Sequence, residues 1–154
     1  MSHFHIQKVE ILDTQLLLPL AEESAREGFR HLGRLMNEYA NGSNQFDQDG
    51  EALFIAKLGS DIVGVCGLNR DHYTNGADVG RVRRLYVMPS VRRFGIGRML
   101  LASVIAEARK SYHLLVLKTD NHQADVFYRS LGFSMNSDSD HHTHFLVLNV
   151  TNEY

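Results

Sequence analysis

The sequence predicts an α/β fold, in which one mixed β-sheet carries helices on both of its faces. Segments with the apolar spacing of strands and helices follow one another in the order βααβββαβαββ. The continuous apolar run Leu114–Leu117 is typical of a strand buried on both faces, which requires helices above and below the sheet. The polar turn Gly59–Asp61 predicts a hairpin, and therefore antiparallel neighbours. A length of 154 residues fits a single domain over residues 1–154.

The N-terminal segment predicts a strand and then a helix. Apolar and polar residues alternate in His3–Leu12, which is the pattern of a strand. Leu16–Glu27 predicts a helix that Thr14 can cap and that tolerates Pro19 only in its first turn. Gly28 interrupts the pattern, so we expect this helix to end there.

A second helix and the hairpin follow. Apolar residues recur at three- and four-residue steps in Phe29–Ala40, which is the spacing of an amphipathic helix. The loop Asn41–Gly50 is polar and contains glycine, so it is a natural place for mobility and for contact with a variable ligand. Ala52–Leu58 and Ile62–Leu68 are the two predicted strands of the hairpin, and a loop over residues 69–76 follows them.

The next segment predicts a strand, a glycine turn and a helix. Val79–Val87 is rich in β-branched, aliphatic and aromatic residues, and Pro89 ends the strand because it cannot donate a ladder hydrogen bond. Gly95–Gly97 then leads into Gly97–Lys110, a run of good helix formers. A helix start behind a glycine turn offers free N–H groups and a positive dipole end. This arrangement suits a phosphate or pyrophosphate.

The C-terminal segment completes the sheet. His113–Thr119 predicts a buried strand, and Asp120 or Asn121 caps a last helix that Gly132 ends. Two final strands are predicted around the polar turn of residues 137–142, namely Phe133–Asn136 and Thr143–Val150.

The overall charge is nearly balanced, but the arginines cluster. A formal net charge of −2 and a sequence pI of about 6.5 argue against a general nucleic-acid binder. A large share of the arginines falls near the glycine turn: Arg81, Arg83, Arg84, Arg92, Arg93 and Arg98. A basic patch on a mildly acidic protein indicates a small anionic ligand.

Cysteine usage and hydropathy bound the cellular context. Cys66 is the only cysteine, so no internal disulfide can form, and its apolar surroundings predict a buried, inert thiol. The apolar run Leu16–Ala21 is far shorter than the roughly 20 residues that span a membrane, and no signal peptide is visible. We therefore expect a cytoplasmic protein that does not enter a membrane.

The glycine turn does not fit two common phosphate-binding patterns. A Walker loop needs a lysine and a hydroxyl after its last glycine, and neither follows Gly97. A dinucleotide fingerprint needs a third glycine, where this chain has Leu100. The chain instead has two separated motifs, Arg92-x-x-Gly95-x-Gly97 and Asn121-x-x-Ala124-x-x-Phe127-Tyr128-x-x-x-Gly132-Phe133.

With these two motifs in this order, the sequence resembles the GNAT superfamily of acyl-CoA-dependent N-acyltransferases over about Ala52 to Leu148. The resemblance implies a mostly antiparallel sheet of about seven strands with about four flanking helices, splayed between the fourth and fifth strands. It also implies acetyl-CoA as co-substrate. Homodimers and other oligomers are common in the family, although nothing in this sequence specifies one.

The resemblance also implies where coenzyme A binds. In the family, N–H groups of the first motif bind the pyrophosphate, and the exposed edge of the preceding strand pairs with the pantetheine arm. The matching residues in this chain are Leu85, Tyr86, Val87, Arg92, Arg93, Phe94, Gly95, Ile96, Gly97, Arg98, Asn121, Ala124, Phe127 and Tyr128. Coenzyme A is strongly anionic, so the clustered arginines agree with this assignment independently.

Tyr128 is given the role of general acid by the same resemblance. Its phenol would lie near the thioester sulfur and protonate the thiolate as the acyl group leaves. A neutral phenol with a reference pKa of about 10 can make this donation. The alternative is a core residue, since Tyr128 shares a helix face with Ala124, Phe127 and Leu131.

The group that takes the proton from the acceptor amine is left open. Many family members use a glutamate on the strand before the glycine turn, where this chain has Arg81. The candidates near the family's acceptor cleft are Glu38, Asp71, His72, Tyr73 and Asp78, and a water chain is a further route. Strand alternation puts Arg81, Arg83 and Leu85 on one face, which would favour an acceptor bearing a carboxylate or phosphate.

Three histidines near the C-terminus invite a metal interpretation. His142 and His144 would share one face of the final strand, but their third partner, His141, lies in a Ser/Asp turn without carboxylate geometry. We expect no bound metal. A surface or cleft-rim position fits these histidines better, with His144 lining the acceptor end.

Together, these patterns predict an N-acetyltransferase that moves an acetyl or short acyl group from acetyl-CoA to a primary amine of a small molecule or peptide. Neither Cys66 nor any serine lies in the setting of a nucleophile, so we expect direct attack within a ternary complex. The alternative is a non-catalytic module of the same fold that binds or senses acyl-CoA, which the missing strand carboxylate favours.

Overall fold

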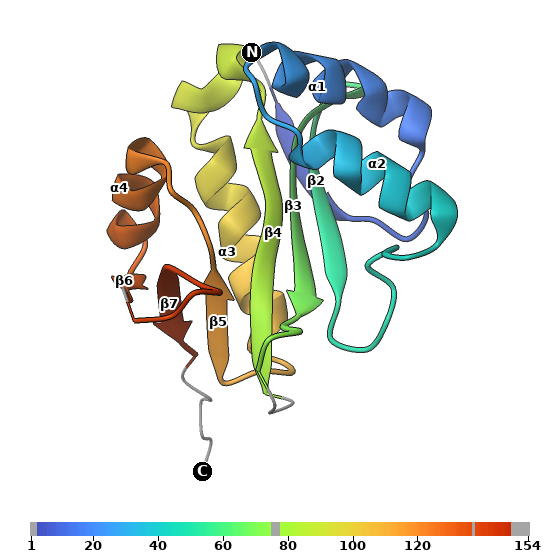
Figure 1. Ribbon diagram of the computed structural model, residues 1–154. Helices are drawn as coiled ribbons and strands as arrows, with labels where there is room; N and C mark the ends of the chain where they lie inside the picture. Colours follow the sequence, from blue (N-terminus) through green and yellow to red (C-terminus); the bar gives the residue numbers. More distant parts are fainter. Residues whose placement is uncertain (1–2, 75–77, 137, 149–154) are drawn as a thin grey trace.

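The computed structural model describes residues 3–74, 78–136 and 138–148, and these form one seven-stranded sheet with helices around it (Figure 1). In chain order the strands are β1 Phe4–Lys8, β2 Ala52–Leu58, β3 Asp61–Arg70, β4 Val79–Val87, β5 Leu114–Leu117, β6 Ser134–Met135 and β7 His144–Val147. The helices are α1 Thr14–Arg26, α2 His31–Asn41, α3 Ile96–Ala108, α4 His122–Ser130 and the 3₁₀ helix η1 Pro89–Phe94.

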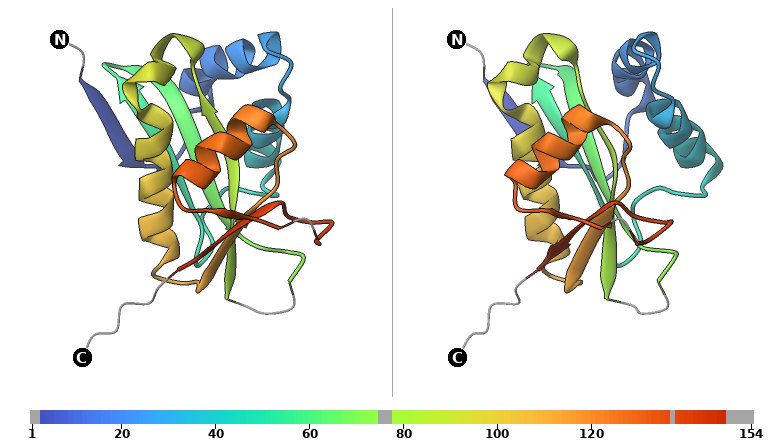
Figure 2. Two further views of the ribbon diagram at one scale, coloured as in Figure 1. Left: turned by 90° about the vertical axis from the view of Figure 1, so that its left-hand side faces the viewer. Right: turned by 60° about the vertical axis from the view of Figure 1, so that its left-hand side comes forward.

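The helices cover both faces of the sheet (Figure 2). α3 packs against β2, β3 and β4 on one face, while α1 contacts β3 and α2 contacts β4 on the other. Each face has its own apolar core, in which Leu100 and Leu101 of α3 are fully buried on one face, and Leu17 of α1 and Leu35 of α2 on the other. Each such side chain contributes roughly 1.5–3 kcal/mol. Within the described residues, no helix is long and apolar enough to cross a membrane.

β4 and β5 are the parallel pair at which the sheet opens. In the strand order β1-β2-β3-β4-β5-β7-β6, all other neighbours are antiparallel. The β4–β5 ladder runs only from Val79↔Leu114 to Arg81↔Val116, whereas β4 continues to Val87. Among the described residues, 82–87 therefore have no β5 partner. The predicted mostly antiparallel sheet, splayed between its fourth and fifth strands, is confirmed.

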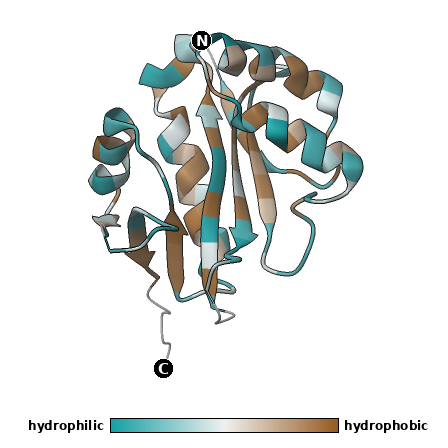
Figure 3. Ribbon diagram, in the orientation of Figure 1, coloured by the Kyte–Doolittle hydropathy of each residue, from teal (hydrophilic) through white to brown (hydrophobic). Residues whose placement is uncertain are grey.

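A β-bulge in β4 changes which side chains share a face. Beside the middle of β3, β4 has one residue more than its partner, and Arg84 adopts a φ of 64°. Arg84 contacts Glu38 on the α2 face, while Leu85 packs into the cluster beneath α3. The prediction that Leu85 shares a face with Arg81 and Arg83 is therefore wrong, because strict alternation does not hold across a bulge. Figure 3 shows hydrophilic bands interrupting β4, where its arginines fall.

The first strand and helix differ from the predicted bounds. α1 begins at Thr14 because Asp13, and not Thr14, caps it: the Asp13 carboxylate accepts the Gln15 N–H at 3.0 Å. Pro19 consequently lies inside the helix, beyond its first turn. β1 ends at Lys8, short of the predicted Leu12, because the chain then leaves the sheet edge for α1.

Smaller differences occur at other ends. Gly28 breaks the helical region at a φ of 91°, as predicted, but α2 begins at His31 and not at Phe29. Of the predicted strand Phe133–Asn136, only β6 pairs with β7. Residues 149–150 of the last predicted strand, residue 137 of its turn and residues 75–76 of the earlier loop lie outside the described residues.

Candidate functional site

The turn between β4 and α3 has the features of an anion-binding site. Gly95 takes a φ of 78°, a left-handed conformation that glycine adopts without strain, and α3 begins at the next residue. Ile96 is fully buried, which fixes the start of the helix, whereas Phe94 is 53% exposed. No side chain caps the first N–H groups of α3. These N–H groups and the positive end of the α3 dipole can therefore bind a phosphate.

The arginines of this turn have different partners. Arg93 and Arg98 are exposed, and Arg98 makes one long contact of 3.4 Å to the Ser130 hydroxyl. Arg92 donates from Nε to the Val87 carbonyl at 3.0 Å and from its two other nitrogens to a glutamate. Arg93 and Arg98 thus keep guanidinium groups available to a bound phosphate, while Arg92 supports the end of β4.

That glutamate is Glu27, at the C-terminal end of α1, which sequence reasoning missed. Its carboxylate accepts a hydrogen bond from the Tyr86 hydroxyl at 2.6 Å, and the Arg92 guanidinium lies 5.4 Å from the centroid of the Tyr86 ring. Hydrogen bonds from Arg92 and then Tyr86 hold the pKa of Glu27 below its usual range. No sequence signal could have found Glu27, because 59 residues separate it from Tyr86.

The two sequence motifs meet where α4 approaches α3. A Cβ added at Gly97 would lie 3.4 Å from the Phe127 ring, so glycine at this position allows the close approach. Ala124 and Phe127 pack against the apolar cluster beneath α3. Residues 85–87 of β4 lie on the open edge nearby, so the predicted cofactor residues of both motifs line one region of the sheet.

Tyr128 is a buried tyrosine at the base of this region. Its side chain is 7% exposed, and its ring makes edge contacts with Phe127 and Phe133 at centroid distances of 5.3 and 5.6 Å. Within the described part of the chain, its hydroxyl has no hydrogen-bond partner. Burial raises the pKa of Tyr128, so the phenol stays protonated at neutral pH.

A buried histidine fixes α4 to β7. Asn121 caps α4, accepting the Ala124 N–H at 3.0 Å, as predicted. His144 is 1% exposed, and its two ring nitrogens lie 2.7 Å from Asp125 and 2.7 Å from Thr143. Its predicted place at the cleft rim is therefore wrong, because the ring is enclosed between α4 and β7. Hydrogen bonds from Arg129 and then His144 lower the pKa of Asp125 to about 2.

Arg81, which stands where the family's glutamate is expected, is held within the protein. Its Nε donates to Asp71 at 2.7 Å and another nitrogen donates to the His141 carbonyl at 2.7 Å. The pair is buried, and the Tyr73 ring lies 5.1 Å from the Arg81 guanidinium. Burial alone would raise the pKa of Asp71, but hydrogen bonds from Thr74 and Arg81 outweigh it and keep that pKa low.

Arg84, at the bulge, forms a second fixed pair that the sequence did not reveal. It donates to Glu38 of α2 at 3.0 Å. His31, at the start of α2, lies 6.1 Å from Tyr86 between ring centroids, and its Nε2 is buried with no partner among the described residues. Burial, followed by the Arg84 charge, lowers the pKa of His31, so its ring is neutral at neutral pH.

Of the remaining predicted acceptor residues, some line a common hollow and others lie outside it. Glu38, His72 and Arg83 line one hollow on the α2 face, with a volume of about 460 Å³. Tyr73 lies outside this hollow. It is 61% exposed, it stacks on His141 with ring centroids 4.1 Å apart, and its ring lies beside the Arg81 guanidinium. Asp78 lies just before β4, 3.7 Å from His113, and does not line this hollow.

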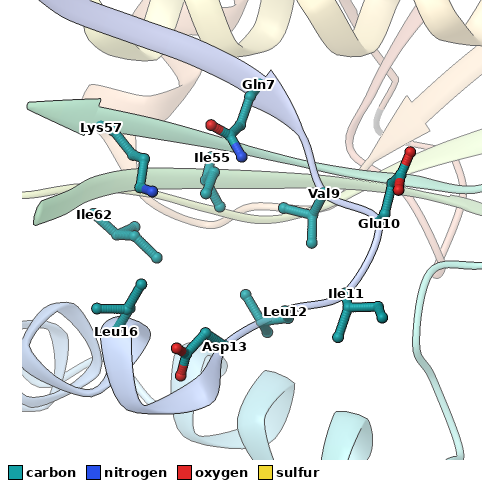
Figure 4. Close-up of a pocket in the computed structure, with 10 residues that line it drawn as sticks. All are labelled: Gln7, Val9, Glu10, Ile11, Leu12, Asp13, Leu16, Ile55, Lys57 and Ile62. Atoms are coloured by element: carbon teal, nitrogen blue, oxygen red, sulfur yellow. The ribbon is translucent and has the colours of Figure 1, made fainter. Parts of the chain in front are cut away.

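A second hollow, of about 220 Å³, lies far along the sheet from this region (Figure 4). It is lined by residues of β1, of the connection to α1, and of α1, β2 and β3. Its lining includes no residue of β4, so it is separate from the hollow on the α2 face.

The placement of side chains supports neither a metal site nor a cysteine nucleophile among the described residues. Over the described ranges 3–74, 78–136 and 138–148, no three His, Cys, Asp or Glu side chains gather as metal ligands would. Cys66 is fully buried, and burial raises its pKa, so it remains an unreactive thiol.

Known proteins are similar to this chain in sequence and in fold. Residues 49–135 match the family described as Acetyltransferase (GNAT) domain. N-alpha-acetyltransferase RimI of Mycobacterium tuberculosis is 36% identical over 78 residues, which cover 51% of this chain and 49% of that protein. The matched segment thus spans only about half the length of that curated relative.

Two solved structures show the same architecture over nearly the whole chain. A candidate acetyltransferase from Exiguobacterium sp. 255-15 has a TM-score of 0.84 and 35% identity, covering 94% of this chain and 93% of that one. The structure of yncA from Salmonella typhimurium with its cofactor acetyl-CoA has a TM-score of 0.67 and 18% identity, covering 97% and 96%, and shows the fold alone. With a match that contains both motifs and the open strand edge, the chain belongs to the GNAT acetyltransferase family.

Proposed function

We propose that this chain is an N-acetyltransferase, which transfers the acetyl group of acetyl-CoA, or a related short acyl group, to a primary amine. One observation carries the proposal: the open edge of β4 over residues 82–87 runs directly into the uncapped start of α3 behind Gly95. A ligand with an amide-bearing arm and a pyrophosphate matches both features, and coenzyme A has both parts. Family membership supports the same cofactor.

Each part of the cofactor then has a partner. The pyrophosphate binds the N–H groups of residues 96–98, with the Arg93 and Arg98 guanidinium groups close by. The amides of the pantetheine arm pair with the backbone of residues 85–87. Arg92 supports the site without touching the cofactor, because its hydrogen bonds to Val87 and Glu27 keep the end of β4 in place.

The proposed reaction is a direct attack. The amine nitrogen forms a bond to the thioester carbonyl carbon, and backbone N–H groups of β4 stabilise the resulting oxyanion. Collapse of this intermediate breaks the C–S bond, and the sulfur takes the proton of the Tyr128 hydroxyl. Because Cys66 is buried with a raised pKa, we include no acyl-enzyme step.

The amine must also lose a proton to a base at the acceptor end. Glu38, Asp71, His72, Tyr73 and Asp78 are the candidates from the sequence, and the structure adds His31. Glu38 and Asp71 are each paired with an arginine, which engages part of each carboxylate. The pH dependence of kcat/KM for single variants of these residues distinguishes them, since loss of the base removes the acidic limb of the profile.

Thiol release from acetyl-CoA in the presence of a panel of amines, amino acids and peptides tests the proposal. Release that depends on the added amine, together with the acetylated product by mass spectrometry, is the expected result. Binding of acetyl-CoA without turnover on any amine would instead indicate a module that senses acyl-CoA. No binding of acetyl-CoA at all would contradict both.

A further inference from the structure

The hollow on the α2 face adjoins the reactive strand edge. Its walls come from the C-terminal end of α2, the loop between α2 and β2, the end of β3, and β4 at its bulge. Arg83 lines it and also belongs to the segment 82–87, which has no β5 partner in the described chain. An acceptor held in this hollow would therefore lie next to the strand that is proposed to carry the thioester.

The polar walls of the hollow are mostly paired with one another. The Asn69 amide donates to Asn44 at 3.1 Å and to Glu51 at 2.9 Å, and Asn44 donates back to Asn69 at 3.0 Å. Glu38 is bound by Arg84. These bonds fix the shape of the hollow before a ligand arrives, which lowers the entropic cost of binding.

Arg83 differs from the other arginines of β4. Arg81 is held by Asp71 and Arg84 by Glu38, but Arg83 forms no hydrogen bond or ion pair within the described residues. It is partly buried, and burial, followed by the Arg84 charge, lowers its pKa. A partly desolvated cation beside a like charge gains more from an anionic ligand than an exposed one would.

The other charges around Arg83 restrict the anion. Glu38, Asp47 and Glu51 line the same hollow, so the field there favours an ammonium group and opposes a doubly charged phosphate. The planar fork of a guanidinium matches the two oxygens of a carboxylate. A molecule with one ammonium and one carboxylate fits this arrangement of charges.

Building on the proposed acetyl transfer, we propose that Arg83 binds a carboxylate of the acceptor, so that the acceptor is an amino acid or another amine that carries a carboxylate. The amine approaches the thioester from the hollow, and the carboxylate remains on the guanidinium during attack. Arg83 thus selects the acceptor, whereas Arg81 and Arg84 maintain the surrounding structure.

The test compares amino acids with their carboxamides, which keep the amine and lose the anion. We would measure kcat/KM by thiol release for glycine, alanine and lysine, each beside its amide, with Arg83→Gln, Arg83→Lys and the control Arg109→Gln. The control removes an equal charge from an exposed position at the end of α3. For the unaltered protein, kcat/KM for each acid is expected to exceed that for its amide by about tenfold or more. This ratio corresponds to the loss of one charge-assisted hydrogen bond. Arg83→Gln should abolish the preference, Arg83→Lys should keep part of it, and Arg109→Gln should keep it fully.

Two results separate this inference from the proposed function. Equal use of acids and amides by the unaltered protein, or an equal loss for both in Arg83→Gln, would overturn the role of Arg83 while acetyl transfer stands. If no amine is acetylated, the proposed function fails, and calorimetry with the same amino acids decides the site. Binding that Arg83→Gln removes supports it, and no binding to the unaltered protein overturns it.

Discussion

The proposed cofactor end and the proposed acceptor end of this site offer different kinds of groups to a ligand. At the cofactor end, the groups offered to the ligand are mainly backbone groups: the free edge of β4 and the first N–H groups of α3. At the acceptor end they are charged side chains, and two of the arginines of β4 are already held by Asp71 and Glu38. The first end therefore depends on backbone conformation, whereas the second depends on individual charged side chains.

This difference says how each end should respond to change. A backbone site depends on helix starts, glycines and strand pairing, so most side-chain changes leave it intact. A side-chain site depends on individual charges and on the bulge at Arg84 that positions them. Variants of the backbone anion site should therefore change the Kd of acetyl-CoA. Variants at the acceptor end should change the KM for the amine or the free energy of unfolding.

The largest expected effect belongs to Tyr128→Phe. If the phenol protonates the leaving thiolate, kcat should fall by about a hundredfold or more, the usual scale of general acid catalysis. Acetyl-CoA binding and stability should change little, because the hydroxyl has no hydrogen-bond partner in the described chain and the ring stays packed. Steady-state kinetics and calorimetry measure both. Phe133→Leu is the packing control, because Phe133 also contacts the Tyr128 ring, and unchanged kcat in Tyr128→Phe across pH would mean that Tyr128 is only a core residue.

Arg81→Met tests whether the acceptor end contains a structural pair. The change leaves the buried Asp71 carboxylate without its cation, so the free energy of unfolding should fall by about 3 kcal/mol. Arg81→Met combined with Asp71→Asn should recover much of that loss, since no unpaired charge remains. Urea denaturation of the unaltered protein and these two variants supplies the comparison. A stable Arg81→Met with a higher KM for the amine would instead make Arg81 an acceptor ligand.

Gly97→Asp tests the backbone anion site. A carboxylate in the first turn of α3 is favourable for the helix dipole but repels a pyrophosphate, so the Kd of acetyl-CoA should rise by about tenfold without loss of stability. Gly97→Ala is the control, because its Cβ meets the Phe127 ring at 3.4 Å and adds no charge. Calorimetric titration with acetyl-CoA gives both values. Equal weakening by the two variants would show that crowding, and not charge, is responsible.

The smallest expected effect is a pH dependence of stability, which comes from the Asp125–His144 contact between α4 and β7. The pKa of Asp125 is lowered to about 2 by Arg129 and His144, from a usual value of 3.8. Between these values the unfolded chain binds a proton more readily than the folded one, so this stabilisation is complete above about pH 4 and is lost as the pH falls towards about 2. Thermal unfolding of Asp125→Asn should show a shallower loss over that range. Parallel curves for both proteins would exclude the contribution.

The sequence predicted the backbone around the proposed cofactor end well, and the reason is physical. Glycine, proline and apolar spacing determine backbone conformation locally, so the strand, the turn at Gly95 and the start of α3 could be placed from neighbouring residues. The Asn121 cap followed from the same local chemistry. Even there, Glu27 was not predicted, because its contacts with Tyr86 and Arg92 join distant parts of the chain.

The acceptor end was predicted less well because its contacts are non-local. A single extra residue in β4 turned Leu85 to the other face, and nothing in the local sequence marks that bulge. His144 was expected at the rim and is buried, because its partner Asp125 lies on another element. Which arginine is paired depends on Asp71 and Glu38, so Arg83 could be distinguished from its neighbours only in the folded structure.

If acyl transfer is direct, the two ends of the site must hold both substrates at the same time. Initial rates of thiol release, measured while acetyl-CoA and a carboxylate-bearing amine are both varied, test this simultaneous binding. We expect intersecting double-reciprocal lines, as direct attack in a ternary complex requires. Parallel lines would mean that the acyl group first moves to the protein, and would exclude direct attack.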